Sequence, residues 1–435
     1  MAATVESAVA KSSFEIDRVF GNNGTVTGAN GPISNAAVLG PKALAVDGSG
    51  RLIVGAASGS EWTVWRILRS GKLDPTFGDG GKVVVNSWGE TENPAFVTLA
   101  SAAVRPDGRI LLVGYRAGRM IGNRRPEVAY MIMKQLLPDG SPDSSFGVDG
   151  GKQAGARRGA TSVVLRSNGG FLVAGFKQYS PTGQTDDAAL FSFSKAGKIE
   201  RNFGQGENVD GLNIFGAHGK PSDFFDVDVL DDGRILAAGI IRNSLLVMKL
   251  HANGTFDRSF GKGGKVVYLP DRKARWAAAR EFAVDKKGRI LVAGYGSPKN
   301  PDVKAQYGLV IRLRRDGRLD KTFASRGTAR LFATANGGYR STRLYDLALD
   351  EGGGIWVTGS AGPDLRSKRH AIIVRYRSNG RKDPKFFNKG LLSLRIGEAS
   401  VGYTTIRSGR KISVSGRYDV GDEERFFVKR FVSSR

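Results

Sequence analysis

The sequence predicts an all-β chain that folds as a seven-bladed β-propeller with four-stranded antiparallel blades. Two observations lead to this prediction. An element of the form Asp-x-x-Phe-Gly-x-x-Gly, as in DPTFGDGG at 74–81, recurs along the chain. Two short apolar segments follow each copy after a gap, and the three signals together define units of roughly 60 residues. Repeated units with several short strands are typical of propeller blades.

Seven phenylalanines mark the repeated element, and we call them the anchor phenylalanines. Neighbouring anchors lie 57 to 69 residues apart. The last copy is degenerate, because Phe387 replaces the first glycine after the anchor. The anchors are Phe20, Phe77, Phe146, Phe203, Phe260, Phe323 and Phe386.

The apolar segments are interpreted as β-strands. They are short, rich in Val, Ile, Leu and aromatic residues, and bounded by Asp-Gly, Asn-Gly or Ser-Gly turns. No segment shows a convincing 3.6-residue apolar period. In the second unit, four strands are expected at about 101–105, 110–114, 128–136 and 151–153. We call the strands of each unit A, B, C and D in chain order.

The repeated element is expected to be structural, as the turn from strand C to the outer strand D. Its aspartate, for example Asp74 or Asp320, can accept backbone N–H groups in an Asx turn. Its phenylalanine is expected to fill the space between neighbouring blades. Its glycines allow the chain to reverse direction.

The two ends of the chain predict how the ring closes. The sequence begins with an anchor and one D-like segment, GTVTG at 24–28, with no A, B or C segment before it. It stops after a C-like segment at 425–431. Pairing of these segments would complete the last blade and remove exposed strand edges. We therefore expect one propeller domain over 16–435, preceded by an N-terminal extension over 1–15.

The pattern D-x-x-F-G-x-x-G-x-V, followed by segments such as DGRILLVG at 107–114, resembles the delta-60 repeat β-propeller family of bacteria, with blades similar to those of NHL-type propellers. The resemblance covers about 16–432. It implies a propeller, often on exported bacterial proteins, but no reaction and no functional residues. An extracellular or cell-surface location is expected from it. A cytoplasmic location stays open, because the first residues lack the features of a signal peptide.

Composition limits the classes of function and partner. The chain has 435 residues, a formal net charge of +25 and no cysteine, which excludes disulfides and thiolate metal sites. No apolar run approaches the ~18–20 residues of a membrane span. A basic surface attracts anions, so the expected partner is an acidic protein, an anionic glycan or nucleic acid. The propeller is expected to be a monomer.

Three acidic residues form the first candidate site. In NHL-type propellers strand A lines the central channel, and the D–A and B–C loops share one face. Aligning the A strands on their turn glycines gives one channel position per blade. This position is occupied by Ala43, Ser101, Ser162, Asp226, Glu281, Asp346 and Tyr403. The acids of three consecutive blades are expected near the channel mouth, with His218 just upstream.

These acids support more than one interpretation. Asp226, Glu281 and Asp346 could hold a divalent cation such as Ca²⁺. One of them, or His218, could serve as a general acid or base. Blade-to-blade salt bridges with Arg280 and Arg343 would explain the same acids without any chemistry.

A basic patch on the loop-rich face is the second candidate site. Arginine recognises phosphate, sulfate and carboxylate groups through paired N–H donors. An aromatic neighbour could stack on a base or a sugar. The patch is formed by Arg116, Arg119, Arg124, Arg125, Arg157, Arg158, Arg275, Trp276, Arg366, Lys368 and Arg369.

Three hypotheses for function follow. The first is a non-catalytic propeller that binds an anionic partner on its loop-rich face and needs no cofactor. The second is a propeller hydrolase or lyase with a divalent cation held by the three acids. The third is a purely structural module of the cell surface. The fold alone does not decide between them, since propellers include binding modules and enzymes.

Overall fold

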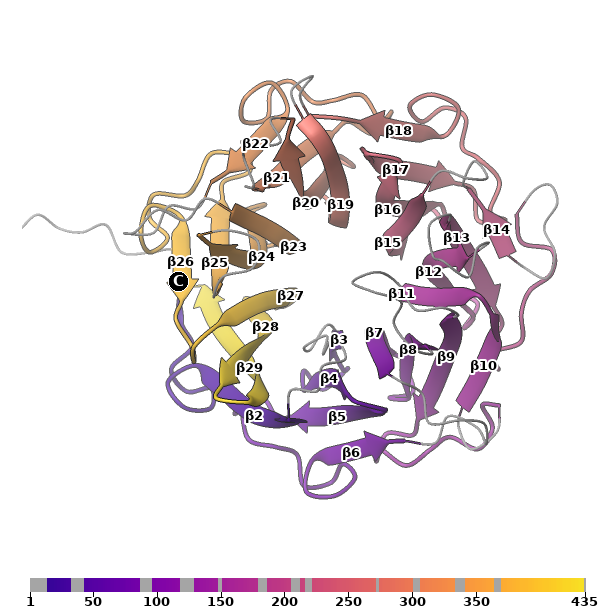
Figure 1. The fold of residues 1–435 in the computed structure, drawn as a ribbon, viewed down its shortest axis with the longest axis vertical. Helices are drawn as coiled ribbons and strands as arrows, with labels where there is room; N and C mark the ends of the chain where they lie inside the picture. Colours follow the sequence, from indigo (N-terminus) through magenta and orange to yellow (C-terminus); the bar gives the residue numbers. More distant parts are fainter. Residues whose placement is uncertain are drawn as a thin grey trace, which may run out of the picture.

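A computed structural model of the chain describes residues 14–32, 43–86, 96–117, 129–147, 151–178, 186–204, 212–215, 221–270, 274–299, 306–332, 341–363 and 369–433. Within these ranges every regular element is a β-strand. The strands form seven antiparallel sheets, which are arranged as blades around a ring (Figure 1). The predicted all-β, seven-bladed propeller is confirmed.

Six blades contain four strands that follow one another from the ring axis outward, as predicted for strands A to D. Blade 1 contains β3 (Ala43–Val46), β4 (Leu52–Ser58), β5 (Glu61–Ile67) and β6 (Lys82–Val85); blade 2 contains β7 (Phe96–Val104), β8 (Ile110–Ala117), β9 (Ala129–Leu136) and β10 (Gly151–Ala156); blade 3 contains β11 (Arg158–Leu165), β12 (Phe171–Gln178), β13 (Asp186–Phe193) and β14 (Leu212–Ile214). Blade 4 contains β15 (Ser222–Val229), β16 (Ile235–Ile241), β17 (Ser244–Leu250) and β18 (Lys265–Tyr268); blade 5 contains β19 (Ala274–Val284), β20 (Ile290–Pro298), β21 (Tyr307–Leu313) and β22 (Thr328–Leu331); blade 6 contains β23 (Ser341–Leu349), β24 (Ile355–Gly362), β25 (His370–Tyr376) and β26 (Leu391–Leu394).

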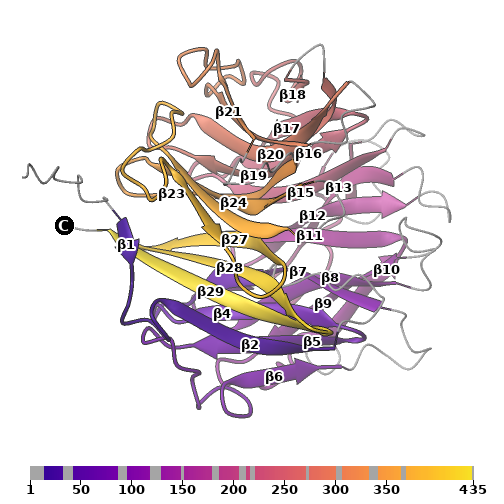
Figure 2. The same ribbon diagram turned by 60° about the vertical axis from the view of Figure 1, so that its left-hand side comes forward.

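The seventh blade is built from both ends of the chain. Its strands β27 (Ser400–Ser408), β28 (Lys411–Val420) and β29 (Glu423–Ser433) come from the C-terminal part, and β2 (Thr25–Pro32) adds the outer strand. An additional strand, β1 (Phe14–Ile16), pairs with the end of β29 (Figure 2). The sequence predicted that β2 completes this blade, but it did not predict β1. β1 crosses the predicted boundary between the extension over 1–15 and the propeller over 16–435.

The hydrophobic core lies between neighbouring blades. Seven clusters of buried apolar side chains occur in the described part of the chain, and each combines two adjacent blades. All seven anchor phenylalanines are at most 4% exposed. Phe77, for example, belongs to the cluster shared by blades 1 and 2. The anchors therefore fill the blade interfaces, as the sequence predicted.

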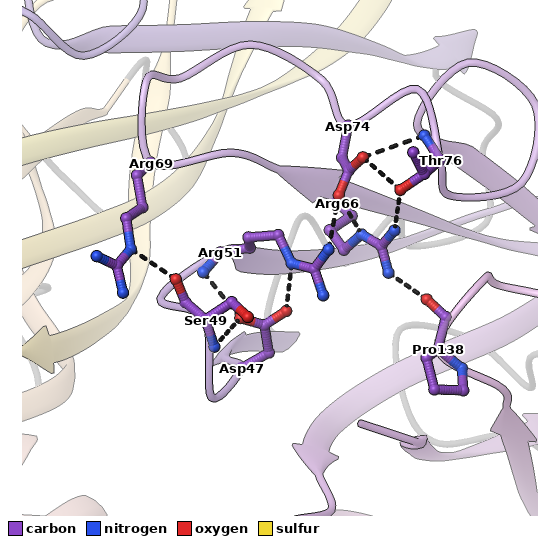
Figure 3. A network of polar contacts seen from close by, with 8 residues as sticks. All are labelled: Asp47, Ser49, Arg51, Arg66, Arg69, Asp74, Thr76 and Pro138. Atoms are coloured by element: carbon purple, nitrogen blue, oxygen red, sulfur yellow. Dashed lines mark hydrogen bonds and ion pairs between the residues drawn. The ribbon is translucent and has the colours of Figure 1, made fainter. Parts of the chain in front are cut away.

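The aspartate of the repeated element organises a buried polar network (Figure 3). In blade 1, Asp74 Oδ1 accepts the backbone N–H of Thr76 at 3.1 Å and its hydroxyl at 2.7 Å, which is the expected Asx turn. Asp74 Oδ2 accepts Arg66 Nε at 2.7 Å and Arg51 Nη1 at 3.0 Å. The Arg66 guanidinium also lies over the ring of Phe77, at 4.6 Å from its centroid.

The same network links blade 1 to blade 2. Arg66 Nη1 donates to the carbonyl of Pro138 in blade 2, and the backbone N–H of Gly78 donates to the carbonyl of Asp139 at 2.7 Å. Equivalent ion pairs join Arg312 to Asp320 at 2.8 Å, and Arg430 to Asp17 at 2.8 Å. The repeated element is thus structural, and it holds both its own turn and the neighbouring blade.

Six of the inner strands contain a β-bulge at the same position. The residue left without a partner on strand B is Ala100, Thr161, Phe225, Arg280, Tyr345 or Tyr403. Opposite each bulge, strand B has a glycine whose added Cβ would lie only 1.8–2.1 Å from a carbonyl oxygen of strand A. The glycine that ends each segment like DGRILLVG is therefore required, because the bulged strand A approaches it closely. These glycines are Gly114, Gly175, Gly239, Gly294, Gly359 and Gly416.

Candidate functional site

A cavity of about 580 Å³ lies on the ring axis, with side chains from all seven blades in its wall. Each bulge supplies two successive residues to this wall, the bulge residue and the residue after it. The bulge residue comes first along strand A, nearer the end that follows the D–A loop, and the residue after it lies nearer the A–B turn. The cavity therefore contains two stacked layers of side chains. The bulge layer lies nearer the loop-rich face, and the following layer lies deeper.

The chemistry of the wall differs between the two halves of the ring. Blades 1 to 3 contribute mainly small, hydroxyl or aliphatic side chains, such as Leu44, Ala100 and Ser162. Blades 4 to 7 contribute the charged residues and most of the aromatic ones. These are Phe225, Asp226, Arg280, Glu281, Arg343, Tyr345, Asp346 and Tyr403. The seven-fold scaffold therefore carries a strongly asymmetric site.

The three predicted acids do meet in this cavity. Asp226 is hydrogen-bonded to Glu281 of the next blade. Its Oδ1 accepts the hydroxyl of Ser162 at 3.1 Å and the N–H of Val227 at 2.8 Å. Its Oδ2 accepts the N–H of Phe282 at 3.4 Å. Asp226 therefore connects blades 3, 4 and 5.

Asp346 makes an equivalent connection between blades 6 and 7. Its Oδ1 accepts the N–H of Leu347, and its Oδ2 accepts the N–H of Thr405 at 2.8 Å. Asp346 is 7% exposed, as is Asp226. Hydrogen bonds from backbone N–H groups beside the bulges thus hold the carboxyl groups of both aspartates in place.

Burial and mutual repulsion raise the pKa values of the three acids. Burial is the largest cause of the raised pKa of Glu281, followed by the charges of Asp226 and Asp346. The pKa of Asp226 and that of Asp346 are also raised, chiefly by burial. With their pKa values raised, these carboxyl groups hold protons to a higher pH than free carboxyl groups do.

Replacing Glu281 with glutamine should raise the thermal midpoint of unfolding at pH 8 but not at pH 4. The folded protein holds the Glu281 proton more tightly than the unfolded chain does, because the pKa is raised by folding. The stability contributed by this proton is present below the ordinary glutamate pKa of about 4.3 and is lost as the pH rises through the raised pKa. Glutamine does not ionise, so each kcal/mol regained should shift the midpoint by roughly 1 °C in a domain of this size.

Differential scanning calorimetry at the two pH values measures this effect. Glu15→Gln is the matched control, because Glu15 is exposed on β1. A Glu281→Gln midpoint that differs from the native one equally at pH 4 and pH 8 would contradict the raised pKa.

Two arginines of the cavity do not pair with the acids. Arg280 lies over the ring of Phe225, at 4.0 Å from its centroid, and its Nε is buried without a hydrogen-bond partner. Arg343 is hydrogen-bonded to Gln306 and lies over the ring of Tyr295 at 5.5 Å. Among the described residues neither forms an ion pair with Asp226, Glu281 or Asp346. The expected blade-to-blade salt bridges are therefore replaced by bonds to backbone N–H groups and by the Ser162 hydroxyl.

The sequence alignment of the channel position was right in five blades and wrong in two. Leu44 and Thr404, not Ala43 and Tyr403, occupy the layer of the acids, and Tyr403 is itself a bulge residue. In blade 1 the turn glycine and the strand-B glycine are closer together in the sequence than in blades 2 to 6. In blade 7 the bulge and the turn glycine are closer together. Leu44 lies 11 residues before Gly55 and Thr404 lies 12 residues before Gly416, whereas the other five residues of this layer lie 13 residues before their strand-B glycines, so no fixed offset from a glycine gives the correct residues. The acids lie in the middle of the inner strands, not at the mouth.

The basic patch is only partly within the described residues. Five members lie outside them, namely Arg119, Arg124, Arg125, Arg366 and Lys368. His218, which was predicted near the acids, also lies outside the described residues. The remaining members, which are Arg116, Arg157, Arg158, Arg275, Trp276 and Arg369, lie outside the wall of the cavity.

The described members of the patch have different surroundings. Arg157 and Arg275 are exposed. Arg116 lies over the ring of Tyr130 at 4.7 Å, and Arg158 lies 5.9 Å from that of Phe191. Arg369 has a structural role, since its Nε donates to Ser360 Oγ at 3.0 Å and its Nη2 to the Ser360 carbonyl at 3.0 Å.

Sequence reasoning missed the bulge layer of the cavity. Arg280 was considered only as a partner of the acids, and Tyr345 was not considered at all. A signal was present in the sequence, because a strand-B glycine lies opposite the bulge in six of the seven blades.

Within the described ranges, no group of three or more His, Cys, Asp or Glu side chains is arranged to hold a metal ion. The cation therefore stays a prediction. The same part of the chain has no helix that could cross a membrane.

The fold and its axial cavity define a seven-bladed β-propeller. One family, described as "Domain of unknown function (DUF5122) beta-propeller", matches residues 230–260, which run from the turn before β16 to the anchor Phe260. A search of curated proteins gives no match.

Solved structures give distant matches. A protein from Lactobacillus plantarum shares 13% identity over 90% of this chain and 89% of that chain, with a TM-score of 0.40. The AfRom2 CNH domain shares 10% identity over 93% and 98%, with a TM-score of 0.41. The α-L-arabinofuranosidase Arb93A from Fusarium graminearum, in complex with an iminosugar inhibitor, shares 9% identity over 81% and 97%, with a TM-score of 0.47. Likeness at this level carries no argument about function.

Proposed function

We propose that this chain is a non-catalytic binding propeller whose central cavity takes an anionic group of its ligand. The observation that carries the proposal is Arg280, a guanidinium in the cavity wall that stacks on Phe225 and has no acidic partner among the described residues. Arginine binds carboxylate, sulfate and phosphate through paired N–H donors. A cation left unpaired in a concave, partly apolar site favours a ligand that supplies the missing negative charge.

Two further features support an anionic ligand. The raised pKa values of the three acids reduce the negative charge beside Arg280. The chain carries a formal net charge of +25, and exposed cations such as Arg157 and Arg275 lie at the loop side of the inner strands. Such a field raises the local concentration of anions and speeds their association.

Replacing Arg280 with glutamine should abolish the stabilisation of the protein by its anion. A ligand that binds only the folded state stabilises it by about 2.7 kcal/mol at a concentration of 100 times its Kd. We expect at least one of acetate, sulfate, phosphate and glucuronate to raise the thermal midpoint of the native protein. The same anion should leave Arg280→Gln unchanged. Differential scanning fluorimetry at constant ionic strength measures both effects.

Arg275→Gln is the matched control, because Arg275 is exposed and lies outside the cavity wall. It removes the same charge and should keep the response of the native protein. Equal responses in all three proteins would show that anions bind elsewhere on the basic surface, and the absence of any response would overturn the proposal.

The hydrogen-bonded carboxyl pair favours a hydrolase or lyase as the second candidate function. Glu281 with a raised pKa is suited to donate a proton, and the adjacent Asp226 is suited to accept one. A divalent cation at these acids and Asp346 belongs to the same candidate. Native mass spectrometry of the protein purified without chelator separates the two functions. A bound divalent ion that is lost in Asp226→Asn would favour the enzyme, and metal-free spectra of both proteins would favour binding alone.

A further inference from the structure

An aromatic strip leads from the cavity toward the loop-rich face. It consists of Trp276, Tyr295, Tyr345 and Tyr403, all of which are half-buried. The ring centroids are 5.5 Å apart between Trp276 and Tyr295, 5.8 Å between Tyr295 and Tyr345, and 5.6 Å between Tyr345 and Tyr403. The inner two rings line the cavity, and the outer two lie outside its wall. The first two contacts are edge to face, at 79° and 71°, the third is tilted at 49°, and Arg343 lies over one face of Tyr295. The strip is thus a chain of contacting, partly accessible rings across blades 5 to 7.

We propose that the ligand is an oligosaccharide that ends in a sugar acid. This inference rests on the proposed function, since the carboxylate of the terminal sugar binds Arg280. The following sugars extend along the aromatic strip toward Trp276. Aromatic side chains offer flat apolar surfaces to the carbon-bound hydrogens of a sugar ring, while their edges leave its hydroxyl groups accessible. The spacing of the rings allows successive sugars of one chain to meet successive aromatic residues.

The deeper layer of the cavity suits the hydroxyl groups of the terminal sugar. It combines the hydroxyls of Ser101, Ser162 and Thr404 with the three carboxyl groups. Protonated and ionised carboxyls together can donate and accept hydrogen bonds, as sugar hydroxyls do.

The charge of the site favours a carboxylate over a phosphate. Arg280 has no acidic partner among the described residues, Arg343 is already hydrogen-bonded to Gln306, and three carboxyl groups lie in the adjacent layer. A carboxylate brings one negative charge, which Arg280 neutralises. A phosphate brings up to two charges, and the second would face the carboxyl groups.

Isothermal titration calorimetry with defined sugars tests the proposal. The probes are galacturonate, trigalacturonate and the neutral trisaccharide maltotriose. We expect trigalacturonate to bind about tenfold more tightly than galacturonate, a gain of about 1.4 kcal/mol. Maltotriose should bind at least about tenfold more weakly than trigalacturonate, because it has no carboxylate for Arg280.

Two variants locate the contributions. Trp276→Leu should reduce the affinity for trigalacturonate toward that for galacturonate, with galacturonate binding unchanged. Arg280→Gln should lose both sugars. Tyr268→Leu is the control, because Tyr268 is a half-buried tyrosine on the outer strand β18, away from the cavity. Thermal midpoints close to the native value show that each variant is folded.

The outcomes separate this inference from the proposed function. If acetate or sulfate binds at Arg280 as tightly as galacturonate does, the sugar acid is wrong while anion binding stands. If trigalacturonate binds no more tightly than galacturonate, the aromatic strip is not part of the site. If a single-stranded oligonucleotide binds more tightly than either sugar and depends on Trp276, the ligand is a nucleic acid and the inference is overturned. If no anion binds in the cavity, both proposals fail.

Discussion

Replacing Asp74 with alanine should lower the free energy of unfolding by about 3–5 kcal/mol, because it leaves a buried guanidinium without its acid. Asp74 and Arg66 are each 3% exposed and are joined at 2.7 Å (Figure 3). The variant also loses the two bonds from Thr76 that form the turn. Arg66 would then be a desolvated charge directly at the interface with blade 2. Equilibrium unfolding in urea, followed by tryptophan fluorescence, measures the loss.

Asp79→Ala is the matched control for Asp74→Ala. Asp79 lies in the same copy of the repeated element but is exposed, and its change should stay within about 0.5 kcal/mol. Similar small effects for both variants would mean that the polar network of Figure 3 contributes little to stability. The structural interpretation of the repeated aspartate would then be wrong.

Removing residues 1–32 should open the ring and lead to aggregation or to a much lower thermal midpoint. The truncation deletes β1 and β2, which cover one side of β29 from Glu423 to Ser433. It also removes the fully buried anchor Phe20, and loss of such a side chain alone typically costs about 3–5 kcal/mol. The exposed edge of β29 would become a template for pairing with other chains. Size-exclusion chromatography with light scattering, together with a thermal melt, measures both effects.

Removing residues 1–13 is the control, because it ends before β1. This shorter truncation should behave as the intact protein does. A synthetic peptide of residues 14–32 should partly restore the midpoint of the longer truncation when it is added in excess. A monomeric 33–435 chain with the midpoint of the intact protein would show that the N-terminal strands do not hold the ring together.

The blade number and the ring closure were predictable because both depend on repeated local signals. Each blade interface needs one large apolar residue and one tight turn, so the anchor and its glycines recur in the sequence. The additional strand β1 has no such repeat. Its only signal is Phe14, whose ring centroid lies 4.8 Å from that of the buried Trp356. This contact depends on the closed ring. A contact between residues so far apart in sequence gives no periodic pattern.

The candidate site was predictable only for the acids. Asp226, Glu281 and Asp346 stand out because their neighbours at the same repeat position are small or apolar. The pairing of Asp226 with Glu281, and the lack of an ion pair at Arg280 within the described residues, depend on the direction in which each bulge turns two successive side chains. Side-chain direction at a bulge is a property of the paired strands, and a one-residue shift changes it.

The repeated inner strand shows that one backbone position of this fold accepts several different side chains. Seven copies of one backbone position carry leucine, serine, serine, aspartate, glutamate, aspartate and threonine, and the copies after a bulge keep the same register with strand B. The bulge itself is set by a glycine on the neighbouring strand and by main-chain bonds, not by the side chain that faces the axis, although Asp226 and Asp346 also bond to neighbouring blades. An engineer could therefore rewrite the cavity one blade at a time and obtain a receptor for a different small molecule on an unchanged scaffold.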